Sequence, residues 1–228
     1  NSREILHETR HLSAQGAGVC IGRPVTGLPK NGQAVHIQII QISDEVINPA
    51  DLQTLPVGEI GEIAVKGSSV TQKYIGRDQV NRLAKIILEN GETIHRMGDV
   101  GYFDEKGRLW YCGRKSQRVQ ITGGTLFTEA VEGIFNAHPL VYRTALVGVK
   151  NAGSLETAQQ ACLWVELLPS ARGADQNLVR AELLEMAKNY EMTRAIKNIL
   201  FHPSFPTDVR HNSKIIREKL AKQAQGRI

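Results

Sequence analysis

A β-hairpin is predicted between His95 and Arg114 of this 228-residue chain. The four residues Asp-Glu-Lys-Gly at 104–107 supply its turn, because Gly107 can take the positive φ that such turns need. Pairing of the two strands brings Asp99 close to Arg114. A carboxylate and a guanidinium held side by side could grip a polyol such as ribose, or form a plain ion pair on a solvated turn. The pattern alone favours neither interpretation.

The composition is that of an ordinary soluble globular protein, with 41% hydrophobic and 22% charged residues. The length is enough for a sizeable core in one or two domains. The formal net charge is +5, and only 5% of the residues are aromatic. A nucleic-acid site needs a basic patch with interleaved aromatic residues, so no nucleic-acid partner is predicted.

The cysteines and histidines indicate neither a metal site nor a disulfide framework. Cys20, Cys112 and Cys162 form no CxxC pair, and the seven histidines are scattered. No apolar run approaches the roughly 20 residues of a membrane span, and no secretory leader is expected. The predicted setting is therefore reducing and cytoplasmic.

The chain divides into two parts of different pattern, which together predict an α+β fold. Residues 1–112 are expected to be mostly β, with strands at 35–42 and 61–67, a surface loop at 43–56 and a helix at 78–88. Beyond Gly113 the pattern predicts strands at 117–121, 145–149 and 161–167 and helices at 128–135, 178–190 and 213–224, with Thr128 as an N-cap. The boundary is placed at 113–116.

Several motifs follow one another in an order that resembles the adenylate-forming superfamily, which includes acyl-CoA synthetases, fatty acyl-AMP ligases and luciferases. Ordered motifs that cover nearly the whole chain are far more specific than one glycine-rich match. The matching segments are Ile21–Pro24, Gly61–Gly67, Gly98-Asp99, Gly113-Arg114, Ile121–Glu132 and a lysine, Lys214, after the proline Pro206.

Within this superfamily the chain is most similar to the β-lactone synthetases of long-chain olefin biosynthesis. The similar stretches are His95–Asp99, Arg143–Val149 and His202–Leu220. Enzymes of that branch resemble acyl-CoA synthetases, but they activate a β-hydroxy acid whose hydroxyl closes a lactone ring with release of AMP.

The resemblance implies a domain plan: a β-rich, distorted barrel-like subdomain at 1–112, a hinge at 113–116 and a small α+β lid domain at 117–228. It also implies that Asp99 holds the ribose hydroxyls of ATP and that Arg114 assists at the ribose or phosphate. Lys214 would approach the acyl carboxylate and α-phosphate, where a cation offsets developing charge. Taken alone, Lys214 is one of several lysines in a solvated stretch.

The same resemblance assigns Arg114, Lys115 and Ser116 to the hinge, and Gly123 and Gly124 to the path of a thiol acceptor. The alternative for the two glycines is a plain turn, and both interpretations stay open. The chain departs from the common family pattern at three places, with Met97, Ser116 and Ser213 where most members have Thr, Asp and Gly.

One segment mimics the family's phosphate-binding loop. Thr26–Lys30 reads Thr-Gly-Leu-Pro-Lys, but it lacks the preceding Ser/Thr/Gly run whose amides would cradle a phosphate. It is interpreted as a turn between strands. The real loop and the family's adenine motif are expected to lie before residue 1.

The predicted function is the C-terminal portion of an ATP-dependent enzyme that activates a fatty or β-hydroxy carboxylic acid as its acyl-adenylate. The resemblance implies Mg-ATP, and CoA in members that make thioesters. The partner of this chain would be the N-terminal part of the large domain, and the chain alone is expected to be inactive. A free-standing binding or regulatory module derived from such a lid is the alternative, and a basic nucleic-acid binder is a third.

Overall fold

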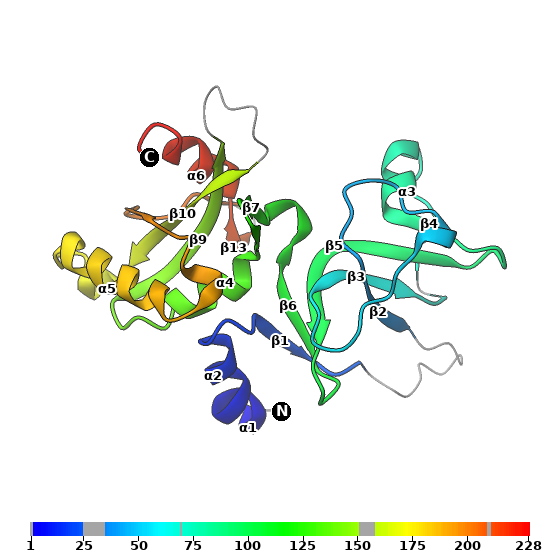
Figure 1. Cartoon of the computed structure of the whole chain (residues 1–228), viewed down its shortest axis with the longest axis horizontal. Coiled ribbons are helices and arrows are strands. Elements are labelled where there is room, and N and C mark those ends of the chain that lie inside the picture. The colour runs from blue at the N-terminus through cyan, green and yellow to red at the C-terminus, as the bar shows by residue number, and fades with distance from the viewer. Residues whose placement is uncertain (1, 25–34, 69, 151–157, 209–210) are drawn as a thin grey trace. The chain divides into compact units, whose positions relative to one another are not determined.

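The computed structural model describes residues 2–24, 35–68, 70–150, 158–208 and 211–228, so the segment Thr26–Lys30 lies outside the described residues. The chain forms two compact units (Figure 1). Unit 2 is Cys20–Ser116, and unit 1 combines Asn1–Val19 with Gln117–Ile228. Both contain helices and strands, which confirms the predicted α+β class.

Unit 2 is built on a six-stranded sheet in which β1, β6, β5, β3 and β2 are neighbours in that order and β4 also pairs with β5. The pairs β2–β3, β3–β5, β4–β5 and β5–β6 are antiparallel. Its elements are β1 (Val19–Gly22), β2 (His36–Ile40), η2 (Pro49–Asp51), β3 (Gly61–Lys66), α3 (Asp78–Ala84), β4 (Lys85–Ile87), β5 (Thr93–Phe103), β6 (Leu109–Arg114) and η3 (Lys115–Gln117), which continues into unit 1.

The sheet of unit 2 differs from the sequence predictions in two respects. The expected barrel-like closure is not seen, because the strand path is open and its end strands β1 and β2 are not neighbours among the described residues. The helix predicted over 78–88 ends at Ala84, because Lys85–Ile87 pair with β5 as strand β4. Pairing with the next strand in the chain thus outweighs the helical spacing of this segment.

Alternate residues of the strands bury the two faces of this sheet. Ile40, Ala64, Ile86 and Ile94 pack together in one cluster, while Ile39, Ile63 and Leu109 form another. Neighbouring residues such as Ile39 and Ile40 therefore enter different clusters, as the period of two of a β-strand requires.

Unit 1 centres on a three-stranded sheet in the order β11–β10–β9, with β9 antiparallel and β11 parallel to β10. Two small hairpins, β7–β8 and β12–β13, complete its strands. Its elements are α1 (Ser2–Glu4), η1 (Ile5–Thr9), α2 (Arg10–Ser13), β7 (Val119–Ile121), β8 (Gly124–Leu126), α4 (Thr128–Phe135), β9 (Val141–Lys150), β10 (Gln159–Leu167), η4 (Pro169–Ala171), α5 (Gln176–Lys188), η5 (Glu191–Thr193), β11 (Asn198–Phe201), β12 (Thr207–Asp208), β13 (His211–Ile215) and α6 (Arg217–Ala224).

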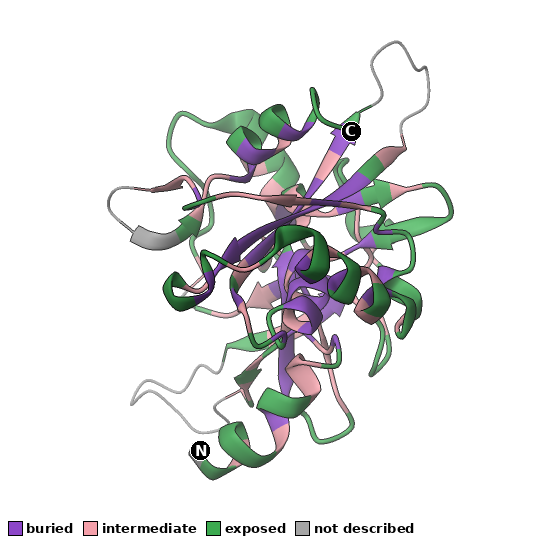
Figure 2. Cartoon of the chain, turned by 90° about the vertical axis from the view of Figure 1, so that its left-hand side faces the viewer, coloured by how far each residue is buried: buried purple, intermediate pink, exposed green. Residues whose placement is uncertain are grey.

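Strand β10 is buried on both faces, so the sheet is the middle layer of unit 1 (Figure 2). On one face Leu163 and Val165 pack in a cluster with residues of α4 and α5. On the other face Cys162 and Trp164 pack with Leu220 and other residues of α6. A helix layer on each side explains why this strand reads as a continuous apolar run.

Residues 2–13 of unit 1 are helical, a segment for which no element was predicted. Two local predictions in unit 1 are wrong. Helix α4 begins after Phe127, and the Thr128 hydroxyl makes no capping bond and is buried without a hydrogen-bond partner. The helix expected at 213–224 starts only at Arg217, so Lys214 lies on strand β13.

Candidate functional site

The hairpin of β5 and β6 forms as predicted and brings Asp99 and Arg114 together. Gly107 takes a φ of +68° in the turn, and its N–H donates to the carbonyl of Asp104 at 2.8 Å. The register pairs Asp99 directly with Arg114. Asp99 lies within β5, and Arg114 is the last residue of β6. Arg114 Nη1 lies 3.0 Å from Asp99 Oδ1.

Asp99 and Arg114 differ in their exposure to water. The side chain of Asp99 is 22% exposed and that of Arg114 is 55% exposed. Burial raises the pKa of Asp99, and the Arg114 charge opposes this effect. An ionised Asp99 can only accept hydrogen bonds, so this half-buried carboxylate is suited to two neighbouring hydroxyl donors.

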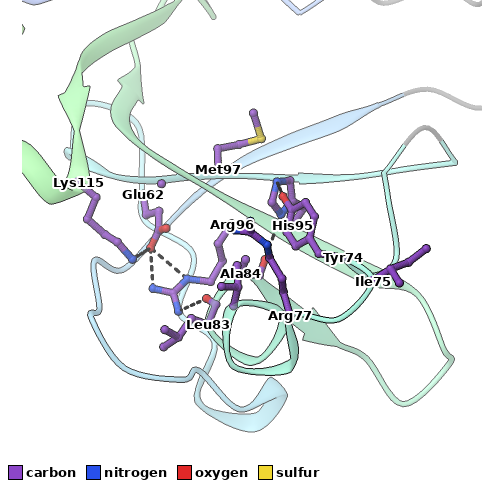
Figure 3. Close-up of a pocket in the computed structure, with 12 residues that line it drawn as sticks. Glu62, Tyr74, Ile75, Arg77, Leu83, Ala84, His95, Arg96, Met97 and Lys115 are labelled. Atoms are coloured by element: carbon purple, nitrogen blue, oxygen red, sulfur yellow. Dashed lines mark hydrogen bonds and ion pairs between the residues drawn. The ribbon is translucent and has the colours of Figure 1, made fainter. Parts of the chain in front are cut away.

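A cavity of about 590 Å³ opens in unit 2 along the residues that precede Asp99 (Figure 3). Helix α3 and the segment before it supply one wall, and β5 supplies the other through His95, Met97 and Gly98. Ile75 is 94% exposed at its rim. The cavity therefore combines apolar side chains with a few polar ones, as small-molecule sites commonly do.

Tyr74 and His95 both line this cavity and contact each other edge to face, with ring centroids 6.2 Å apart. His95 Nδ1 lies 3.1 Å from the carbonyl of Ala84, which can only accept, so Nδ1 carries the hydrogen. Nε2 is then the acceptor for the Tyr74 hydroxyl, 3.4 Å away. Burial lowers the pKa of His95 and thereby favours the neutral ring.

Glu62 forms the floor of the cavity as the centre of a buried ionic cluster, which we call the Glu62 cluster (Glu62, Arg96 and Lys115; Figure 3). Its Oε2 accepts from Arg96 Nε at 3.1 Å, from Arg96 Nη2 at 2.7 Å and from Lys115 Nζ at 3.1 Å. Arg96 also donates to the carbonyls of Ser43, Glu45 and Leu83. Lys115 donates to the carbonyl of Ser43 at 2.7 Å.

The sequence analysis gave no role to Glu62 or Arg96. Each lies on a strand that also carries a second charged residue, Lys66 on β3 and Asp99 on β5, so charge alone does not mark the buried one. Because Glu62 and Arg96 are 34 residues apart in the chain, their pairing could not be seen in the sequence.

Of the remaining predicted site residues, Ser116 is the last residue of unit 2, and the other three belong to unit 1. Lys214 is exposed on β13. Gly123 takes a φ of +87° in the two-residue turn between β7 and β8, and Gly124 begins β8. Apart from their chain neighbours, no described heavy atom lies within 4 Å of the Cβ position of either glycine. The structure thus groups Asp99, Arg114 and Lys115 in unit 2 and places the two glycines at an open hairpin turn.

In the described part of the chain, no group of three or more His, Cys, Asp or Glu side chains is placed to hold a metal ion. Cys20, Cys112 and Cys162, all within the described residues, form no disulfide. None of the helices described here is both long and apolar enough to cross a bilayer.

Two curated proteins described as olefin β-lactone synthetase match almost the whole chain. The protein from Xanthomonas campestris is 44% identical over 221 residues, which are 95% of this chain, and that from Stenotrophomonas maltophilia is 44% identical over 98% of it. The chain belongs to the adenylate-forming superfamily. A probable 4-coumarate–CoA ligase from Dictyostelium discoideum is 26% identical over 86% of the chain. No protein-family model matches it.

Solved structures of adenylate-forming enzymes share the fold. ATP-bound MatB from Rhodopseudomonas palustris gives a TM-score of 0.67 at 21% identity over 92% of this chain. The amide bond synthetase McbA from Marinactinospora thermotolerans gives 0.65 at 23% identity over 90%. The chain spans 38–39% of the length of the two synthetases and 36% of each of these structures.

Proposed function

We propose that this chain supplies the ribose grip, hinge and mobile lid of an enzyme that activates a carboxylic acid as its acyl-adenylate with ATP. The supporting observation is the Asp99–Arg114 pair, which the hairpin register holds together at 3.0 Å within an ordered set of superfamily motifs. The chain matches under two fifths of its curated relatives, so the activity belongs to the whole protein that carries it.

In this proposal Asp99 accepts hydrogen bonds from the two ribose hydroxyls of ATP and AMP. Arg114, more exposed and always charged, keeps one Nη on Asp99 and turns its other donors toward the ribose or phosphate. Lys214 neutralises charge that develops as the carboxylate attacks the α-phosphorus. The nucleotide substrate would be the magnesium complex of ATP, in which the metal would offset phosphate charge.

The hydrogen bonds and ion pairs of the proposed hinge residues indicate which of them is the pivot of the lid. Arg114 is tied to Asp99, and Lys115 is tied to Glu62 and Ser43, all within unit 2. Unit 1 resumes at Gln117. Ser116 lies between Lys115, which is bound within unit 2, and Gln117, where unit 1 resumes, so we place the pivot at Ser116. Lid rotation would then switch the enzyme from adenylation to its second step.

The second step is proposed to be closure of a β-lactone from a β-hydroxy acid. The 44% identity to two olefin β-lactone synthetases supports this product over a thioester. If the product is a thioester instead, Gly123 and Gly124 line the path of CoA. The remaining part of the large domain is the partner that supplies the phosphate loop and the acyl pocket.

An ATP–pyrophosphate exchange assay tests the proposal. The whole protein that carries this chain is incubated with ATP and either β-hydroxy acids or fatty acids, with and without CoA, and the products are identified by mass spectrometry. We expect exchange with the whole protein and none with the 228-residue chain alone. Lys214→Ala should lower the rate of adenylation about 10²- to 10³-fold, while Lys222→Ala, a matched exposed lysine, leaves it unchanged.

Two results would contradict the proposal. Exchange by the 228-residue chain alone would show that it is a complete catalyst rather than a grip and lid. Absence of exchange in the whole protein, together with unaltered AMP binding in Asp99→Asn, would favour the alternative of a non-catalytic binding or regulatory module.

A further inference from the structure

A buried ion pair in unit 1 joins the start of α6 to α4. Arg217 Nη1 lies 2.5 Å from Glu132 Oε1, and Arg217 Nη2 lies 3.0 Å from Glu132 Oε2, so two parallel hydrogen bonds link the two groups. Glu132 is 4% exposed and Arg217 is 9% exposed. Charges withdrawn from water to this extent need a close geometric match, which this bidentate pair provides.

The same guanidinium reaches two further parts of unit 1. Its Nη1 donates to the carbonyl of Leu146 on β9 at 3.3 Å, and the Leu146 N–H donates to Glu132 Oε1 at 2.7 Å. Its Nε donates to Gln117 Oε1 at 3.3 Å. Arg217 is therefore bound to α4, to the central sheet and to Gln117, the residue at which the chain re-enters unit 1.

Lys214 stands three residues before Arg217, on the short strand β13. Strand β13 pairs with β12, which is two residues long, and the register shifts between them. So short a two-stranded ladder is marginally stable by itself. Two side chains after Lys214 attach the strand to unit 1: Ile215 packs against the core cluster of Leu220, and Arg217 is buried in its ion pair with Glu132.

We propose that Arg217 and Glu132 are positioning residues for Lys214. This inference rests on the proposed function. A lid that turns at Ser116 carries Lys214 to a defined place only if the path from Gln117 to Lys214 is stiff. The guanidinium of Arg217 binds Gln117 at the start of that path, and Arg217 itself lies three residues after Lys214, at the end of the path. Misplacement of a reacting group by about 1 Å can cost about 100-fold in rate.

Arg217 acts through Lys214 rather than on the substrate. Its charged head is buried and is bound to Glu132, Leu146 and Gln117. Lys214, three residues earlier, is exposed. Substitution of Arg217 should therefore impair the step that needs Lys214 and leave the ground-state affinity for ATP nearly unchanged.

The kinetic test uses the whole protein that carries this chain, with the variants Arg217→Lys and Glu132→Gln. Arg217→Lys keeps the charge but loses the fork, so it should fold. We expect kcat for ATP–pyrophosphate exchange to fall about 10- to 100-fold with the KM for ATP within about twofold. The control is Arg180→Lys, whose guanidinium bonds the Ile199 carbonyl of unit 1, and it should leave kcat unchanged.

A double-substitution cycle separates positioning from general damage. In a Lys214→Ala background, Arg217→Lys should cause no further loss of kcat, because the group that it positions is already gone. Full additivity, or a kcat for Arg217→Lys within twofold of the parent while Lys214→Ala is impaired, would overturn the inference. Failure of the proposed function has a different signature, since the parent protein would then show no exchange at all.

A measurement on the 228-residue chain tests the inference without any activity. We expect the amides of 211–216 to exchange hydrogen at least about 10-fold faster in Arg217→Lys and Glu132→Gln than in the parent or in Arg180→Lys. Equal exchange rates in all four proteins would overturn the inference even if the parent enzyme is active.

Discussion

Each unit buries a glutamate against an arginine, but the two clusters are built differently. Glu62 uses one oxygen for three donors from two cations, Arg96 and Lys115. Glu132 uses both oxygens for Arg217 in a bidentate pair and accepts one further backbone N–H. With every side chain ionised, the Glu62 cluster carries a net positive charge, whereas the Glu132–Arg217 pair is neutral.

The difference shows what each cluster holds in place. Arg96 also donates hydrogen bonds to three backbone carbonyls. Those of Ser43 and Glu45 lie in a loop, and that of Leu83 lies near the end of α3. Arg217 instead links regular elements, α4, β9 and α6. The first cluster therefore orders irregular backbone beside the cavity, and the second sets the placement of a helix and the strand before it.

Arg96→Met should have the largest effect on stability. It removes the closest cation from Glu62 and takes one donor from each of three backbone carbonyls, so we expect unit 2 to lose about 3–5 kcal/mol. Each unit has one buried tryptophan, Trp110 in unit 2 and Trp164 in unit 1. Urea unfolding followed by Trp110 fluorescence in a Trp164→Phe background measures the loss. A change below about 1 kcal/mol would show that water replaces the guanidinium.

Arg217→Met should cost unit 1 nearly as much, but with a dependence on pH. Burial raises the pKa of Glu132 to about 7, against the lowering effect of Arg217. The folded state thus holds this proton more tightly than the unfolded chain, so the contribution of Glu132 to stability is greatest at low pH and is lost as the pH rises through that value. Without Arg217 we expect a loss of about 3–5 kcal/mol at pH 8 and a smaller one at pH 5.5.

The control for this pH dependence is the double variant Glu132→Gln, Arg217→Met. It has no buried carboxyl at this position, so unfolding followed by Trp164 should show a much flatter dependence between pH 5.5 and 8. Losses for Arg217→Met that are the same at both pH values would mean that Glu132 stays ionised without its partner.

These two clusters also mark the limit of what the sequence could predict. The hairpin of β5 and β6 and the Asp99–Arg114 pair depend on a local turn, and both form as predicted. The Glu62 cluster depends on partners 34 and 53 residues away. In a strand, a charged residue ordinarily indicates a solvated face. The burial of Glu62 therefore becomes evident only when β3 is paired with β5, which carries Arg96.

Secondary structure was missed for a different reason. The helical spacing at 78–88 is real, but pairing with β5, which follows closely in the chain, takes Lys85–Ile87 into the sheet. The sequence predicts a helix at Lys214, and the structure has this residue on β13, which pairs with β12 before the helix starts at Arg217. In both places a short strand that pairs with a neighbour in the sequence replaces a helix that local propensity favours.

Lys115→Met should have a smaller effect than Arg96→Met. Glu62 keeps both hydrogen bonds from Arg96, so only one charge-assisted contact and the bond to the Ser43 carbonyl are lost. We expect about 1–2 kcal/mol for unit 2, measured by the same Trp110 fluorescence. A loss as large as that of Arg96→Met would mean that the two cations contribute equally, contrary to the geometry of the cluster.

Asp99→Asn should have the smallest effect on stability and one of the largest on binding. Burial raises the pKa of Asp99, which means that the fold disfavours its charge, and its partner Arg114 is more than half exposed. Removing that charge should therefore change the stability of unit 2 by no more than about 0.5 kcal/mol. In the whole protein the same substitution should weaken AMP binding about 10- to 100-fold, measured by calorimetry, because the amide replaces one acceptor oxygen with a donor. A strongly destabilised Asp99→Asn with intact AMP binding would instead place Asp99 with Glu62, as a group that the fold needs and the nucleotide does not.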